Sequence, residues 1–150
     1  MVQQGVGPFG EPTPATTVSV VRADLENDAL FVAQSIPTTM TAGQQYASSI
    51  TMKNTGILTW TRSAAYRLGS QNPRDNLTWG IGRVELPLSV AQVLPGEHAT
   101  FAFSVTAPST AVTYNFQWKM VREGVEWFGD PTPNLQITVT DVSSPSSPIL

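Results

Sequence analysis

Apolar and polar residues alternate with a period of two along most of the chain, and turn-forming residues separate the alternating segments. In HATFAFSVT, at 98–106, every second residue after the histidine is apolar: Ala99, Phe101, Phe103 and Val105. This period is typical of strands with one buried face, because successive side chains of a strand point to opposite sides of the sheet. No segment keeps a helical period beyond one turn. The pattern therefore predicts an all-β domain.

The two ends of the chain differ from this alternating core in composition. Residues 1–27 are rich in Gly and Pro near their start and predict an extended N-terminal arm, with one strand-like segment, TTVSVVR, at 16–22. Residues 28–142 carry the alternating pattern and predict the sandwich domain, and residues 143–150, SSPSSPIL, predict a C-terminal tail. The apolar residues of the arms are candidate contacts with neighbouring subunits of an assembly: Phe9, Ile149 and Leu150.

The composition limits the chemistry that the chain can carry. Cysteine is absent, which excludes disulfides, thiolate metal sites and cysteine nucleophiles, and the single histidine, His98, cannot form a histidine-rich metal site. We therefore expect neither a metal nor another cofactor.

The charge pattern also limits the expected partners. The formal net charge is −3 and the basic residues form no run, so we expect no nucleic-acid partner, which would require a concentrated basic patch. No apolar run approaches the roughly 18 residues of a membrane span, so we expect no membrane insertion. The first residues lack the features of a secretory signal, so we expect that the protein works where it is made or that a signal was removed. Only 13% of the residues are charged, which suits virion or extracellular β-proteins.

The segment YNFQWKMVREGVEWFGD, at 114–130, predicts a β-hairpin rich in aromatic residues. A two-residue turn at Glu123 and Gly124 would pair Met120 with Trp127 and place both on one face of the hairpin. We expect that face to be buried, because aromatic faces of β-domains are usually core. The expected core aromatic residues are Trp60, Phe101, Phe103, Tyr114, Trp118 and Trp127.

The same hairpin carries acidic residues, which raises the alternative of a glycosidase site. Such a site needs two carboxyl groups facing each other, roughly 5 to 9 Å apart. The two-residue turn directs Glu126 away from the aromatic face, diagonal to Lys119, whereas Glu123 lies at the hairpin tip. These carboxylates do not converge, so the sequence favours a protein that is not an enzyme.

The loop QNPRDNLTWG, at 71–80, is the strongest candidate for contact with a ligand. It combines Arg74, Asp75 and Trp79, and the end loops of a β-sandwich commonly carry recognition. The alternative is that Trp79 belongs to the core while Arg74 and Asp75 pair at the surface.

A set of residues spread along the sandwich domain has a spacing that matches a known family: Asn54, Gly56, Trp60, Tyr66, Leu68, Trp79, Pro95, Gly96, Ala107, Pro108, Tyr114, Trp118, Trp127, Phe128 and Gly129. On these residues, the chain from about Ala29 to Val142 resembles the four-tryptophan Ig-like domain, the central domain of a eukaryotic selective-autophagy receptor that is also common in bacterial extracellular proteins. The resemblance implies an immunoglobulin-like antiparallel β-sandwich of roughly seven to nine strands, with mostly structural tryptophans and a role in binding or display.

Two functions fit these features. The first is a decoration or surface subunit of a tailed-phage virion, whose arms dock on capsid or tail proteins while the sandwich displays its loops. The second is an extracellular or cell-surface module of a secreted bacterial protein that binds carbohydrate or protein through loop aromatics. Both functions are non-enzymatic, and both consist of binding to another molecule.

Overall fold

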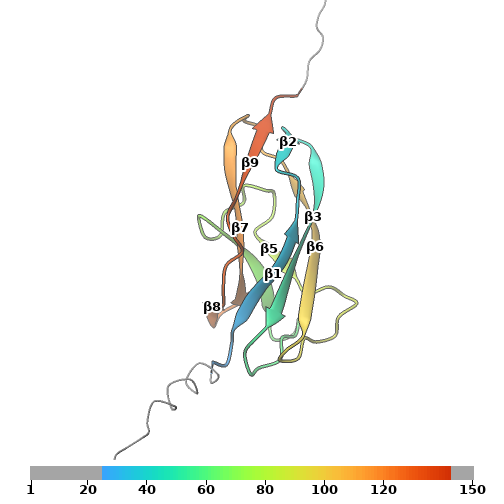
Figure 1. Ribbon diagram of the computed structural model, residues 1–150, viewed down its shortest axis with the longest axis vertical. Helices are drawn as coiled ribbons and strands as arrows, with labels where there is room; N and C mark the ends of the chain where they lie inside the picture. The colour runs from blue at the N-terminus through green and yellow to red at the C-terminus, as the bar shows by residue number, and fades with distance from the viewer. Residues whose placement is uncertain (1–24, 143–150) are drawn as a thin grey trace, which may run out of the picture.

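The computed structural model describes residues 25–142, which form two β-sheets packed face to face (Figure 1). One sheet has the strand order β1-β3-β6; the other has the order β2-β9-β7-β4-β5, with β8 also paired to β7. This arrangement confirms the all-β, Ig-like sandwich and its strand number. The strands are β1 (Ala29–Ser35), β2 (Thr39–Thr41), β3 (Gln45–Asn54), β4 (Tyr66–Gln71), β5 (Arg83–Glu85), β6 (His98–Thr106), β7 (Thr113–Arg122), β8 (Glu126–Phe128) and β9 (Leu135–Thr140).

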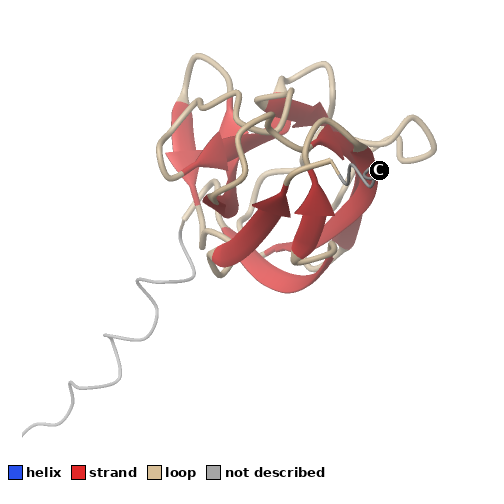
Figure 2. Cartoon of the chain, turned by 90° about the horizontal axis from the view of Figure 1, so that it is seen from above, coloured by secondary structure: helices blue, strands red, loops and turns tan. Residues whose placement is uncertain are grey.

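Strands and loops account for all of the described chain. Figure 2 draws no helix between residues 25 and 142, and this part of the chain accordingly contains no helix suited to crossing a membrane.

The sandwich departs from a purely antiparallel arrangement at one edge. Strand β2 runs parallel to β9, with Thr39 opposite Thr138 and Thr41 opposite Thr140. The chain leaves the three-stranded sheet after β1 and crosses to the other sheet, so β2 continues in the direction of β1 and reaches the last strand. The first part of the domain thus contributes to both sheets.

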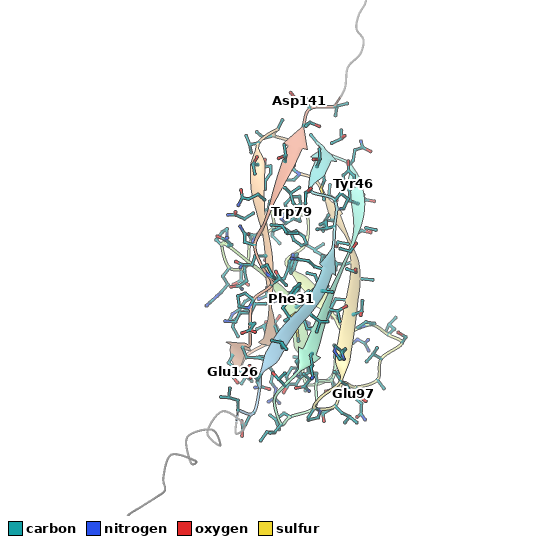
Figure 3. All side chains as sticks on the ribbon, in the orientation of Figure 1. Phe31, Tyr46, Trp79, Glu97, Glu126 and Asp141 are labelled. Carbon is teal, nitrogen blue, oxygen red and sulfur yellow. The ribbon has the colours of Figure 1, made fainter. Side chains whose placement is uncertain are left out.

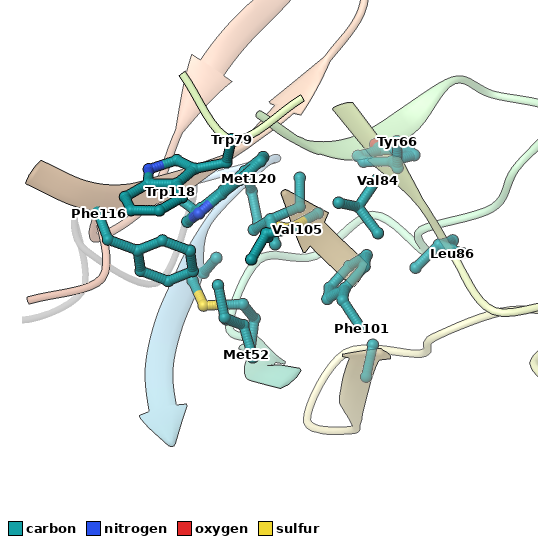
Figure 4. Packing of buried hydrophobic residues seen from close by; sticks show 14 of the residues in the cluster. Met52, Tyr66, Trp79, Val84, Leu86, Phe101, Val105, Phe116, Trp118 and Met120 are labelled. Atoms are coloured by element: carbon teal, nitrogen blue, oxygen red, sulfur yellow. The ribbon is translucent and has the colours of Figure 1, made fainter. Parts of the chain in front are cut away.

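The core lies between the sheets and follows the period-two pattern. In β7 the side chains of Phe116, Trp118 and Met120 are fully buried, and the Trp118 ring lies 5.1 Å from the Phe103 ring. Figure 4 shows Trp118 beside Phe116 and Trp79. Of the remaining aromatic residues expected in the core, Trp60 and Phe101 are fully buried, and Phe103 and Tyr114 are partly buried against the core.

The hairpin between β7 and β8 corrects the sequence-based prediction. Its loop has three residues, so Met120 lies opposite Phe128 and Val121 lies opposite Trp127. The N–H of Val125 donates to the carbonyl of Arg122 at 2.9 Å, and Gly124 has a φ of +78°, which glycine accepts without strain. The expected pairing of Met120 with Trp127 was therefore wrong by one residue.

A shift of one residue exchanges the two faces of a strand. Phe128, and not Trp127, enters the core, where its ring lies 6.0 Å from Trp60 and 5.9 Å from Tyr66. Trp127 lies on the outer face of the sheet and is only half-buried.

The same shift moves Glu126 to the side that was expected to hold Trp127. Its Oε2 atom accepts a hydrogen bond from Asn27 Nδ2 at 2.7 Å, so it is not the partner of Lys119. Asn27 Oδ1 in turn accepts from the hydroxyl of Tyr66 at 2.6 Å. Burial, above all, raises the pKa of Tyr66, which keeps its hydroxyl protonated as a donor. This network fixes the segment that enters β1 at the end of the domain where Figure 3 labels Glu126.

Two contacts hold strand β7, and the first is typical of Ig-like sandwiches. The hydroxyl of Tyr114, near the start of the strand, donates to the carbonyl of Thr110 at 2.8 Å, as in the tyrosine corner of that fold. Between β8 and β9, Thr132 continues the contact with β7: its Oγ1 accepts from the N–H of Trp118 at 2.9 Å, and its N–H donates to the carbonyl of Trp118 at 2.8 Å. Both contacts hold the aromatic strand β7 in place.

Candidate functional site

Trp127 marks a surface that we call the Trp127 face, the outer side of β4, β5, β7 and β8. The end of its ring lies directly over Gly69 in β4, where a Cβ atom would be 2.5 Å from Trp127 Cη2 and 2.6 Å from Cζ3. Real Cβ atoms do not come so close, so a glycine at this position leaves the room that the ring occupies. The glycine at position 69 thus lets a large aromatic ring pack against the outer face of the sheet.

Two arginines lie over the Trp127 ring. The guanidinium carbon of Arg83 is 4.9 Å from the ring centre, and that of Arg74 is 5.2 Å away. A guanidinium at this distance from an indole is attracted by the negative face of the ring, by about 0.5–1 kcal/mol at exposed sites. The ring therefore connects the loop at 71–80 with strands β5 and β8.

A chain of ion pairs crosses the Trp127 face. It begins with Arg62 Nε and Glu85 Oε1 at 3.6 Å, continues through Arg67, and ends where Arg83 Nη2 meets Asp75 Oδ1 at 2.6 Å. Positive and negative groups alternate along it, so each carboxylate lies next to at least one guanidinium. We call this chain the ion-pair ladder; its members in order are Arg62, Glu85, Arg67, Glu123, Arg83 and Asp75.

Arg83 is the best-held member of the ladder. Its Nε donates to Glu123 Oε2 at 2.6 Å, while its Nη2 reaches Asp75. Burial alone would lower the pKa of Arg83, but the hydrogen bonds and charges of Glu123 and Asp75 outweigh burial and raise it. Its guanidinium is thus held in place by two carboxylates and remains charged.

The loop at 71–80 is folded tightly by its own polar groups. Asn76 Nδ2 donates to the carbonyls of Gln71 and Pro73, at 3.0 and 2.7 Å, and Asn76 Oδ1 accepts from the N–H of Thr78. Asp75 has a φ of +66°, a conformation that Asp tolerates better than most residues. This folding places Arg74 over the ring and Asp75 beside Arg83.

The structure separates the three residues that the sequence grouped as a binding site. Arg74 and Asp75 are exposed and lie at the Trp127 face. Trp79 is 2% exposed, and its Nε1–H donates to the carbonyl of Asn115 at 3.0 Å, so it belongs to the core as in the alternative interpretation. The other half of that interpretation was wrong, because Asp75 pairs with Arg83 and not with Arg74. The candidate assembly contacts Phe9, Ile149 and Leu150 lie outside the described residues.

The two glutamates of the hairpin lie on different sides of it, and the side of Glu126 differs from the one that the sequence predicted. Glu123 lies on the Trp127 face with its carboxylate bound by two arginines, whereas Glu126 lies on the other side of the hairpin and binds Asn27. A hollow of about 220 Å³ lies at the hairpin between them and is lined by residues 121–127. Within residues 25–142, His, Asp and Glu form no group of three that could hold a metal ion.

Comparison with known families agrees with the fold. The profile of the family described as the Ig-like domain from next to BRCA1 gene matches residues 35–140. The chain belongs to this family of Ig-like domains. Among solved structures, this Ig-like domain is similar to the CARDB domain of the Pyrococcus furiosus protein PF1109, with a TM-score of 0.50 and 10% sequence identity. The similarity covers 77% of this chain and 96% of that one, and it concerns the fold alone. The comparison with curated proteins gave no match.

Sequence reasoning missed most of the Trp127 face, although two signals for it are present. A glycine inside a strand often marks the close approach of another group, and Gly69 interrupts the strand YRLGSQ in this way. In addition, Arg67, Arg83 and Glu85 alternate with buried neighbours along β4 and β5, which places charged groups together on the outer face. Neither signal identifies Trp127 as the residue over the glycine.

Proposed function

We propose that this Ig-like domain is a non-catalytic interaction domain that binds a protein partner through the Trp127 face. The observation that carries the proposal is the half-buried Trp127 ring, held on the outside of the sheet beneath Arg74 and Arg83. Tryptophan and arginine are among the residue types that most often dominate the energy of protein interfaces. A half-buried tryptophan beside two arginines thus has the composition of a binding site.

The two outer faces of the sandwich differ in a way that supports this choice. On the face formed by β1, β3 and β6, most outward side chains of β3 and β6 are small and uncharged, such as Thr51, Thr100 and Ala102. The large exposed side chains of β1, Leu30 and Val32, are apolar and carry no charge. The Trp127 face combines a large ring with a network of charged groups whose positions the ladder fixes. Binding to such a pre-arranged surface costs less conformational entropy than binding to free side chains.

The structure also favours a protein over a carbohydrate as the ligand. Sugars bind tryptophan by lying flat on an open ring face, but the guanidinium groups of Arg74 and Arg83 already lie over the Trp127 ring. A sugar would have to displace an arginine, and the displaced Arg83 would lose its ion pairs with Glu123 and Asp75. A protein segment can contact the guanidinium groups where they are.

We further propose two biological settings for this interaction domain, in order of preference. The first is a surface subunit of a tailed-phage virion that docks through residues outside the described part. The second is a module of a secreted bacterial protein at the cell surface. The proposed relation to the four-tryptophan domain is compatible with both, and it is supported by three buried tryptophans and one on the outer face.

A photo-crosslinking experiment tests the proposed binding face. Gln71 lies two residues beyond Gly69 on the same face of β4, and Ala102 lies on the opposite outer face. With benzoylphenylalanine at position 71, we expect one discrete protein adduct in an extract of the source organism. With the same group at position 102, the matched control, we expect none.

Competition with unlabelled chain makes this experiment specific. Excess wild-type chain should suppress the adduct, and excess Trp127→Ala chain should not, because the variant lacks the ring that contacts the partner. Equal adducts from both positions, or equal competition by the variant, would contradict the proposed face.

Removal of residues 1–17 and 143–150 distinguishes the two settings. A virion subunit that docks through its arms should remain folded but no longer co-sediment with particles, whereas a binding module should keep its ligand. Urea unfolding of the truncated chain checks that the sandwich is intact. If the truncated chain still co-sediments with particles, docking through the arms is contradicted. If the truncated chain is folded but no longer binds its ligand, the hypothesis of a binding module is contradicted.

A further inference from the structure

We infer that the segment bound by the Trp127 face is acidic, an extended peptide whose carboxylates pair with Arg74 and Lys119. This inference rests on the proposed function of the face and adds the chemical class of its partner. Three observations carry it: the distribution of charge over the domain, the pairing within the ladder, and the position of the two cations beside the ring.

Charge is distributed unevenly over the described residues. The Trp127 face carries five basic groups, namely the four arginines at 62, 67, 74 and 83 together with Lys119, against three acidic ones, which gives a formal charge of +2. The rest of the described chain carries two basic and six acidic groups, a formal charge of −4. A positive face on an otherwise negative protein attracts negative segments and orients them before contact.

The ladder uses all three acids of the face. Asp75 pairs with Arg83, Glu85 with Arg62 and Arg67, and Glu123 with Arg67 and Arg83. Arg74 and Lys119 form no ion pair with any described residue. The excess positive charge of the face is thus located on two side chains with hydrogen-bond donors to offer.

These two side chains lie on the same face as the ring. Lys119 is the cross-strand partner of Gly69, and the ring of Trp127 lies over Gly69. Arg74 lies over the ring itself. A carboxylate accepts two parallel hydrogen bonds from one guanidinium, and an ammonium group binds a second carboxylate as a point charge. An acidic peptide can therefore place carboxylates on both cations while the guanidinium groups of Arg74 and Arg83 stay over the indole.

A second copy of the chain is the competing occupant. The end of the domain near β8 carries Glu26, Asp28, Glu126 and Asp130, and this acidic end of one copy could meet the Trp127 face of another. Such a head-to-tail contact would produce rings or open chains whose population depends on protein concentration. We favour a peptide because the carboxylates of one extended segment can pair with Arg74 and Lys119 together, and sedimentation of the protein alone distinguishes the two occupants.

Fluorescence anisotropy with labelled peptides tests the inference on the full chain. The probe is a fluorescein-labelled peptide of about ten residues, about 33 Å when extended, in which Glu alternates with Ser. Matched peptides carry Gln or Lys in place of Glu. We expect the Glu peptide to bind at least about tenfold more tightly than the Gln peptide, a difference of about 1.4 kcal/mol. Its affinity should fall as salt rises from about 0.01 M to about 0.15 M, because the Debye length shortens from about 30 Å to about 8 Å.

Charge-matched variants locate the binding site. The double change Arg74→Gln with Lys119→Gln should abolish the preference for Glu over Gln. The control Lys53→Gln with Arg122→Gln alters the net charge equally and should keep that preference, because neither residue lies on the Trp127 face. Urea unfolding of each variant shows whether it is folded.

Several outcomes would overturn the inference. These are equal binding of the Glu and Gln peptides, an equal loss in the control variant, or self-association of the wild-type chain that Arg74→Gln with Lys119→Gln removes. The crosslink from position 71 does not depend on charge, so it separates this failure from failure of the proposed face. If the specific crosslink forms but the Glu peptide is not preferred, the proposed binding face stands and the acidic partner is rejected. If neither the crosslink nor the peptide preference is found, the proposed face itself is rejected.

Discussion

Replacement of Trp118 by alanine is expected to lower the free energy of unfolding by about 3–5 kcal/mol, which is the range for removing a large aromatic side chain from a core. The side chain is fully buried and packs against Phe103 and Phe116, with ring centres 5.1 and 5.9 Å away. Thr132 holds the backbone of this residue from outside the strand, so the surrounding chain cannot easily collapse into the space. Urea denaturation should show a lower midpoint with an unchanged slope.

The matched control is Trp127→Ala, which removes the same side chain from the other face of the hairpin. Its ring is half-buried over Gly69 and attracts two arginines, so we expect a loss of only about 1–2 kcal/mol. Had the hairpin formed with a two-residue turn, both rings would be core and both losses would be large. Equal losses at the two positions would therefore contradict the observed register.

The contrast between these tryptophans shows what the sequence predicts well. Within one strand the period of two is enough to assign faces, and it places Phe116, Trp118 and Met120 in the core correctly. Between strands the faces depend on the loop, and Glu-Gly-Val suits a three-residue loop as well as Glu-Gly suits a two-residue one. One residue more in the loop exchanges Trp127 with Phe128. Local alternation therefore predicts the fold but not the surface at this hairpin.

The ladder illustrates a second reason why the site could not be predicted. Its members come from four separate parts of the chain, and none lies at a spacing that indicates a binding motif: Arg62, Arg67, Asp75, Arg83, Glu85 and Glu123. They meet because β4 pairs with β5 on one side and with β7 on the other. That pairing follows from the tertiary arrangement of the sandwich, which the alternation of apolar residues does not specify.

The segment ILTWT, at 57–61, shows where short alternation is ambiguous. Its pattern fits a strand, but the described structure has only a single bridge there, between Trp60 and Val93. The indole of Trp60 is fully buried and stacks with Tyr66 at 6.3 Å, so the apolar pattern reflects burial of one ring. Alternation over so few residues does not distinguish a strand from an irregular segment that inserts one side chain into the core.

Gly129→Ala is expected to destabilise the domain by about 3 kcal/mol or more, because two penalties combine at this position. The residue has a φ of +77°, in which a Cβ atom is strained. In addition, an added Cβ would lie 2.6 Å from both the N and the Cβ atom of Ala29. Ala29 is 3% exposed and its carbonyl accepts the N–H of Asp130 at 2.9 Å, so relief of the contact would separate β1 from the end of β8.

Gly43→Ala separates the two penalties. Gly43 has the same φ of +77°, but an added Cβ would meet no atom within 4 Å. We expect this control to cost only about 1 kcal/mol, the conformational part of the effect. The difference between the two variants then measures the contact between Gly129 and Ala29, which joins the two sheets where β1 begins. If urea unfolding gives equal losses for both, the chain can yield at this contact, and the close approach of β1 to β8 does not contribute to the stability of the sandwich.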